Sequence, residues 1–306
     1  MNPLDWLLDS DPAIRWQAMR DLTDASPAEI AAVRSRIPRE GLGAAILANQ
    51  GSDGSWHLPG KPDWLPTLFT LQLLRATGID PADPLVKAAI KRLEAGYRWD
   101  EEFGAKTFFE GEVEPCINGG ALAIGAYFGH PTQSLADRVV SEQLDDGGWN
   151  CEAPKSKVSS FHTTICVLEG LLEYERAVRP SLGVSTSRKR GEEYLLKRAL
   201  FRRLSSGEVA SPQFLEFAYP PRYHYDVLRA LDYFRSASLL DYVRSDPRLA
   251  DAIQILERKR QPDGRWLLDR SYDEAIAVPI GESVGAPSRW NTLRALRILR
   301  WHKQRE

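Results

Sequence analysis

Apolar residues recur at helical spacing in a series of short segments, and each segment ends at a turn signal. Residues 41–50, with the sequence GLGAAILANQ, form such a segment and stop at GSDGSW, where Asp-Gly indicates a turn. After a linker bounded by prolines, residues 65–78 (LPTLFTLQLLRATG) form the next helical segment, with Gly78 as its C-cap. The two segments together predict one helical hairpin.

The same arrangement recurs four more times, and a helical segment at residues 12–22, capped by Asp11, precedes the first hairpin. Strand patterns are nearly absent from the sequence. The pattern therefore predicts an all-α chain whose residues 1–306 form a single domain. The four further hairpins pair residues 84–95 with 116–129, 134–143 with 161–175, 191–204 with 223–237, and 247–260 with 287–301.

Three of the turns end in a tryptophan, and their spacing indicates a repeat. Trp56, Trp149 and Trp266 are separated by 93 and 117 residues. Each interval is about twice the length of one hairpin, and weaker turns near Trp99 and Ser206 fall between them. A period of about 45 to 60 residues built from two helices is typical of an array whose units bury their apolar faces against their neighbours. Periodicity alone leaves open whether the array is an open solenoid or a closed ring.

The composition and charge of the chain limit the kinds of molecule that we expect it to bind. The formal net charge is −2 and the pI is about 6.3, which gives no electrostatic reason to expect binding to nucleic acid or to an anionic membrane surface. No apolar stretch approaches the roughly 20 residues of a membrane span, and the N-terminus lacks a secretion signal. Three cysteines are too few for a disulfide framework. We expect a soluble cytoplasmic protein.

The turns NQGSDGSW, EQLDDGGW and KRQPDGRW resemble the QW-type repeats of squalene cyclases and other class II terpenoid cyclases. The helix SFHTTICVLEGLLEYE resembles repeat helices in the β subunits of protein prenyltransferases. The resemblance covers most of the chain and implies an α/α toroid, a short barrel of about five helical hairpins plus an N-terminal helix. It also implies that the second helix of each hairpin lines a central cavity, and that this cavity lies toward the N-terminal ends of the inner helices.

The sequence departs from these families in its catalytic motifs. It contains neither the D-x-D-D motif with which class II cyclases protonate their substrates nor the D-D-x-x-D motif that binds magnesium diphosphate in class I terpene synthases. Asp145 and Asp146 belong to a repeat turn. The chain is also about half the size of a two-domain squalene cyclase. Whether the protein is an enzyme is therefore open; if it is one, the resemblance implies a terpene cyclase-like or prenyltransferase-like reaction.

Polar and aromatic residues at the starts of the predicted inner helices are the candidates for chemistry. His224 or Asp226 could transfer a proton with His162 on the opposite side, whereas a structural interpretation has Asp226 capping its helix or orienting His224. The aromatic side chains could line a pocket for an apolar polyene. The candidate catalytic residues are Glu114, Cys116, His162, His224 and Asp226, and the candidate substrate-binding residues are Trp64, Phe161, Tyr223, Tyr225, Trp290 and Asn291.

Zinc is a possible cofactor by resemblance. Protein prenyltransferases hold zinc through an Asp, a Cys and a His on adjacent inner helices, where it activates a thiolate. The corresponding candidates are His162, His224, Asp226 and Cys116, with Cys151 as a second source of sulfur, although the sequence has no Asp-x-Cys.

Three functions follow as alternatives. The first is an enzyme or binding protein for an isoprenoid or similarly apolar small molecule in the cavity. The second is a zinc-dependent enzyme that alkylates a thiol. The third is a non-catalytic helical-repeat protein that binds a protein partner.

Overall fold

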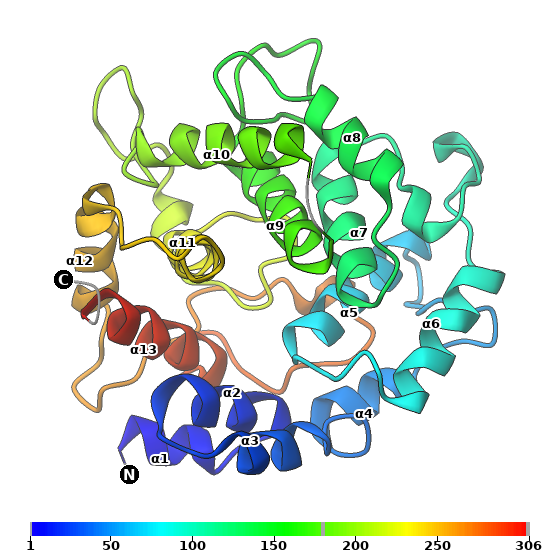
Figure 1. Cartoon of the computed structure of the whole chain (residues 1–306). Helices are drawn as coiled ribbons and strands as arrows, with labels where there is room; N and C mark the ends of the chain where they lie inside the picture. The colour runs from blue at the N-terminus through cyan, green and yellow to red at the C-terminus, as the bar shows by residue number, and fades with distance from the viewer. Residues whose placement is uncertain (1, 179–180, 304–306) are drawn as a thin grey trace.

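The computed structural model describes residues 2–178 and 181–303, and within these ranges the fold is all-α, without a β-strand. Figure 1 shows the helices arranged in a ring around a central space. The helices are α1 (Pro3–Leu8), α2 (Pro12–Leu22), α3 (Pro27–Arg34), α4 (Gly41–Ala48), α5 (Trp64–Ala76), α6 (Pro84–Gly96), α7 (Pro115–Tyr127), α8 (Gln133–Ser141), α9 (Phe161–Ala177), α10 (Leu182–Leu196), α11 (Val227–Asp241), α12 (Ala250–Arg258) and α13 (Arg289–Lys303).

Several of these helices begin at a proline that follows a capping side chain. Asp11 accepts a hydrogen bond from the backbone of Ala13 at the start of α2, and Asp83 does the same at the start of α6. Ser26 and Glu29 form a reciprocal capping box on α3. Each side chain satisfies backbone N–H groups that have no partner within the helix, so the local sequence fixes where the helix starts.

The five predicted hairpins are present as α4/α5, α6/α7, α8/α9, α10/α11 and α12/α13. The second helices of successive hairpins contact one another, from α5 to α7, α9, α11 and α13, and form the inner ring. The α/α toroid expected from the sequence is therefore confirmed.

The N-terminal part of the chain differs from the expectation of one helix, because it forms three. Helix α2 takes a sixth place in the inner ring, between α13 and α5. The indole of Trp16 donates to the backbone oxygen of Thr77 at 2.7 Å, and Gln17 donates to Ala76 and accepts from Arg297 at 3.1 and 3.0 Å. These bonds join the first and last parts of the described chain and close the ring.

The tryptophans of the three repeat turns hold each turn in the same way. All three side chains are fully buried, and each indole N–H donates to a backbone oxygen of the outer helix that precedes its turn. Each tryptophan backbone N–H also donates to a threonine hydroxyl on the inner helix that follows. The indole acceptors are Ile46, Val139 and Leu256, at 2.8, 2.6 and 2.8 Å, and the threonines are Thr67, Thr164 and Thr292. These tryptophans are part of the scaffold.

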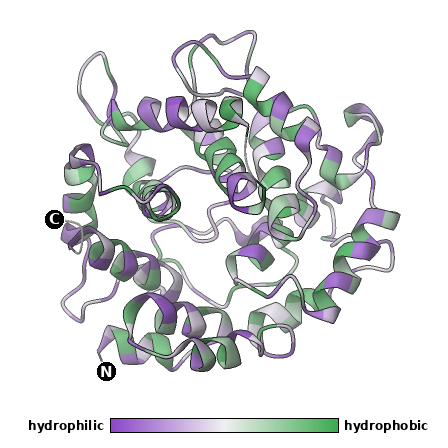
Figure 2. Ribbon diagram, viewed as in Figure 1, coloured by the Kyte–Doolittle hydropathy of each residue, from purple (hydrophilic) through white to green (hydrophobic). Residues whose placement is uncertain are grey.

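The hydropathy of the residues varies along each helix of the ring. Figure 2 shows that most helices carry both apolar and polar stretches, as expected for helices that pack on one side. Among residues 2–178 and 181–303, no helix is both long and apolar enough to cross a bilayer.

Candidate functional site

A cavity of about 750 Å³ lies inside the ring. Its wall comes from α2, α3, α5, α9, α11 and α13, together with Tyr127 at the end of α7, Gly78, residues 219–222 and Ile276. On α5 and α9 the wall residues begin near the middle of the helix, at Phe69 and Glu169, and continue toward its C-terminal end. The expectation that the cavity lies at the N-terminal ends of the inner helices is thus wrong for these two helices.

Two long connections explain this position. The segment containing Phe217 packs on the start of α13, because Asn291 donates to the backbone oxygen of Phe217 at 3.1 Å. Ala277 donates to Thr70, in the middle of α5, at 3.0 Å. These connections fill part of the space beside the starts of the inner helices and displace the cavity along the ring axis.

The wall of the cavity is rich in arginine, which the sequence analysis did not anticipate. Its titratable side chains include nine arginines but three carboxylates, and no lysine lies among the described lining residues. Apolar and aromatic side chains, such as Trp16, Leu172 and Ile276, fill the rest of the wall. The arginines are Arg20, Arg34, Arg75, Arg176, Arg222, Arg229, Arg235, Arg294 and Arg297, and the carboxylates are Glu169, Glu173 and Asp232.

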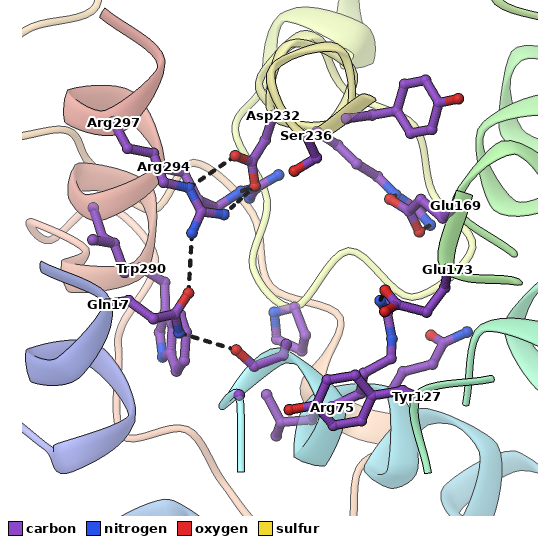
Figure 3. Close-up of a pocket in the computed structure, with 18 of the residues that line it drawn as sticks. Gln17, Arg75, Tyr127, Glu169, Glu173, Asp232, Ser236, Trp290, Arg294 and Arg297 are labelled. Atoms are coloured by element: carbon purple, nitrogen blue, oxygen red, sulfur yellow. Dashed lines mark hydrogen bonds and ion pairs between the residues drawn. The ribbon is translucent and has the colours of Figure 1, made fainter. Parts of the chain in front are cut away.

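Asp232 on α11 is surrounded by three arginines, and we call these four residues the Asp232 group (Figure 3). Arg297 Nε donates to Asp232 Oδ1 at 2.8 Å, Arg235 Nε lies 3.1 Å from the same oxygen, and Arg294 Nε lies 3.9 Å from Oδ2. All four side chains are largely buried. Burial alone would raise the pKa of Asp232, but Arg297 and Arg235 lower it. Burial and repulsion from Arg297 lower the pKa of Arg235, as expected where positive charge is in excess.

The opposite side of the cavity holds a second surplus of positive charge. Arg75 Nη1 on α5 lies 3.0 Å from Glu173 Oε2 on α9, and Arg176 Nη1 lies 3.4 Å from the same oxygen. We call these three residues the Glu173 group. The neighbouring Arg229 is instead neutralised, because its Nε and Nη2 donate to the two oxygens of Glu169 at 2.8 and 2.7 Å.

Three buried hydrogen-bond donors in the wall have no partner among the described residues, and the first is Nε of Arg222, whose Nη1 pairs with Glu274. The second is the hydroxyl of Tyr219, whose ring stacks on Trp290 with centroids 4.6 Å apart. Burial raises the pKa of Tyr219 well above its usual value, so the hydroxyl keeps its proton. The third is Nε of Arg75. A buried donor without an acceptor costs about 1–3 kcal/mol, which makes such groups candidates for contact with a ligand.

Of the residues predicted from the sequence to form the site, the cavity wall contains Trp290. Phe161 and Tyr225 pack against Phe214, with ring centroids 4.9 Å apart in both pairs. Trp64 contacts Phe103 edge to face, and the Asn291 amide binds backbone oxygens. Trp64, Phe161 and Tyr225 therefore pack against other rings and are not part of the cavity wall.

His162 and His224 come together outside the cavity wall, and Asp226 caps the helix that follows. The rings of His162 and His224 lie 5.8 Å apart, and His224 stacks on Tyr272 at 3.6 Å. Burial, His162 and Arg222 lower the pKa of His224 to about 3, and burial lowers the pKa of His162. Asp226 is buried and accepts from the backbone of Arg229 at 2.8 Å, which caps α11. Tyr223, which is partly exposed, packs on His224 with centroids 4.2 Å apart.

Three potential metal ligands gather elsewhere, at the start of α7. Within residues 2–178 and 181–303, one group of Glu, Cys, His or Asp side chains has the spacing of a metal site: Glu114, Cys116 and Cys151, whose ligand atoms lie within 4.8 Å of one another. His162, His224 and Asp226 do not join it. A hydrogen bond from Cys116 lowers the pKa of Cys151, which also contacts Thr163 at 3.4 Å. Two thiols and a carboxylate form a donor set that suits Zn²⁺.

No family model and no curated protein matches the sequence. Similar solved structures include a protein from Actinoplanes, with 12% identity over 95% of this chain and 89% of the other and a TM-score of 0.48. They also include the type II terpene cyclase MstE from Scytonema, with 14% identity over 84% of this chain and 94% of the other and a TM-score of 0.31. A variant of MstE in complex with its substrate geranylgeranyl dihydroxybenzoate has 14% identity over 87% of this chain and 96% of the other, with a TM-score of 0.30. At this distance, the similarities carry no conclusion about ligand or reaction.

Proposed function

We propose that the protein binds a small molecule with an apolar body and an anionic group in its central cavity. The observation that carries this proposal is the surplus of arginine in a largely buried wall. Even with Asp21 and Glu274, which pair with Arg20 and Arg222 from outside the wall, nine arginines face five carboxylates. Uncompensated buried charge is costly, and an anion in the cavity would offset that cost. An isoprenoid-like chain or another apolar group would lie along the apolar part of the wall.

The cavity suits the binding of charge better than the donation of protons. Burial would raise the pKa of Glu169, but Arg229 lowers it, and arginines likewise lower that of Asp232. Both carboxylates are therefore ionised at neutral pH and have no proton to give. Acid-base chemistry by His224 or Asp226 stays a prediction from the sequence, as does a protein partner.

Amphiphilic anions should bind and uncharged analogues should not. We expect decyl phosphate or decanoate to raise the melting temperature and to give a saturable signal in isothermal titration calorimetry, whereas decanol, with the same tail, gives neither. Arg176→Gln removes one charge from the wall and leaves the Arg75–Glu173 pair in place, so the affinity should fall about tenfold.

Arg36 pairs with Glu40 at the surface, and neither residue lines the cavity, so Arg36→Gln is the matched control and should bind like the wild type. Equal binding of decanol and decanoate would contradict the proposal.

A second candidate function rests on the thiol cluster of Glu114, Cys116 and Cys151. We propose that these residues can hold Zn²⁺, with an open fourth position that would allow the metal to activate a substrate thiol. Their contribution would be to fix the ion at the start of α7, with Thr163 orienting the Cys151 sulfur.

Co²⁺ added to the reduced protein should give the intense near-ultraviolet absorption of thiolate-to-metal charge transfer. This absorption should disappear in Cys116→Ser and Cys151→Ser and persist in Cys166→Ser. Absence of the absorption in the folded wild type would refute zinc binding at this cluster.

A further inference from the structure

The Asp232 group and the Glu173 group face one another across the cavity, and from this arrangement we infer that the ligand is a two-headed anion. One anionic group would bind at each end, and the apolar body would lie between them. The inference rests on the proposed function, since it specifies the anion that the same cavity binds.

The two groups lie on opposite sides of the space and come from different helices. In Figure 3, Arg294, Arg297 and Asp232 lie on one side, on α13 and α11, while Arg75 and Glu173 lie on the other, on α5 and α9. The ion pairs within each group span at most 3.9 Å, and none of the ion pairs among the described residues joins one group to the other. Each group is therefore a separate centre of charge.

Each group keeps positive charge that its own carboxylate does not neutralise. Asp232 is shared by three arginines, and Glu173 is shared by two. Of these arginines, Arg297 also lies 3.7 Å from Asp21.

The neighbouring Arg229–Glu169 pair, which is neutral and bidentate, shows that the same wall also contains balanced pairs. Most of the surplus is thus divided between two places, as two bound anions would require. Arg34, which has no ion pair among the described residues, belongs to neither group.

Each group also has one of the three unpartnered donors in the wall, and the remaining one, Nε of Arg222, belongs to neither group. The Tyr219 hydroxyl belongs to the Asp232 side, because Arg294 lies over the Tyr219 ring at 6.0 Å from its centroid. The unpartnered Nε of Arg75 belongs to the Glu173 group. Both are donors, and both would be satisfied by a group that only accepts hydrogen bonds, such as a carboxylate or a phosphate.

Outside the two groups, the cavity wall also has apolar surface. Leu73 and Leu293 line the wall, and the stacked pair of Tyr219 and Trp290 adds an aromatic surface. A volume of about 750 Å³ is within the usual range for a small-molecule pocket, of the order of 300–1,000 Å³. A flexible chain of moderate length with an anionic group at each end fits this distribution of charge and apolar surface.

Chain length distinguishes a two-headed ligand from a one-headed ligand. Isothermal titration calorimetry would compare the affinity of α,ω-dicarboxylates of increasing length with that of monocarboxylates of the same length. A parallel series of α,ω-bisphosphonates would show whether the cavity binds carboxylate or phosphate-type groups more tightly. We expect one narrow range of lengths at which the two-headed anion binds about tenfold or more tightly than the one-headed anion. Shorter two-headed anions cannot reach both groups and should lose this advantage.

Two conservative variants test the ends separately. Tyr219→Phe removes the unpartnered hydroxyl and keeps the ring, and Arg75→Lys keeps the charge and removes Nε. Each variant should reduce the advantage of the best two-headed anion over its one-headed counterpart about tenfold. Arg36→Gln should leave that advantage unchanged. Circular dichroism and melting temperature would confirm that the variants are folded.

The outcomes separate this inference from the proposed function. If no anion of either series binds to the folded wild type, the proposed function itself fails. If one-headed anions bind as tightly as two-headed anions at every length, the cavity binds anions but the two-headed ligand is refuted. The same conclusion follows if Tyr219→Phe and Arg75→Lys both keep the full advantage of the two-headed anion.

Discussion

Replacing Trp149 with alanine is expected to lower the free energy of unfolding by about 3–5 kcal/mol, because it removes a large, fully buried side chain. The indole also donates to Val139 on α8, so its loss leaves that carbonyl oxygen without this partner. Chemical denaturation followed by circular dichroism would measure the change. The equivalent changes at Trp56 and Trp266 should behave alike, since their turns have the same bonds.

Two other variants separate packing from hydrogen bonding at this turn. Trp149→Phe keeps most of the ring volume and loses the N–H, so it should cost less than the alanine variant. Trp64→Ala removes a tryptophan that is only partly buried and lies outside the repeat turns, and its effect should also be smaller. A loss at Trp149 no larger than that at Trp64 would show that the turn is not part of the scaffold.

Replacing Asp232 with asparagine is expected to have opposite effects on stability and on anion binding. The side chain keeps its shape, but Arg235, Arg294 and Arg297 lose their buried counter-charge. The free energy of unfolding should therefore fall by about 3–5 kcal/mol. The cavity becomes more positive by one charge, so decanoate should bind more tightly than to the wild type. A general loss of structure would weaken the binding of decanoate as well. A fall in stability together with tighter binding is therefore a stringent test.

The pH dependence of stability provides a further measurement on the same variant. Because arginines lower the pKa of Asp232 in the folded protein, the ion pairs stabilise the wild type above the ordinary aspartate pKa. This stabilisation is lost as the pH falls toward the lowered value. The stability difference between wild type and Asp232→Asn should therefore shrink as the pH falls below about 4. Glu40→Gln, at an exposed ion pair, should show no comparable stability difference.

The sequence predicted the hairpins because their determinants are local. Helical spacing of apolar residues, proline at the helix starts and Asp-Gly turns all act within one hairpin, so the pairing of α4 with α5 could be inferred from residues 41–78 alone. The N-terminal helices show where this approach fails. The segment at 12–22 was recognised as a helix, but its place between α13 and α5 depends on Gln17 meeting Arg297, a contact that spacing does not encode.

The candidate site was harder to predict, because its position depends on long connections and its chemistry on charged helical residues. Periodicity could not show that the segment around Phe217 would occupy the space beside the start of α13. Arg294 and Arg297 recur three residues apart on α13, as many solvated arginines do, and only the closed ring turns them inward. The signal that could have found them is the density of arginine on two adjacent predicted inner helices, at residues 229, 235, 294 and 297.

The ring closes where α2 contacts α13 and α5, and we call these contacts, made by Trp16 and Gln17, the seam of the ring. The cavity can exist only after the seam has formed during folding. Gln17 and Arg297 are 280 positions apart in the chain, whereas most hairpins form from neighbouring residues. Closing so long a loop is entropically costly and is expected to be a late event. The hairpins can assemble as an open arc before that point, with the arginines still hydrated. Ligand binding should therefore be detectable only after α2 has docked between α13 and α5. An anion that fits the cavity should stabilise the closed ring and slow its reopening.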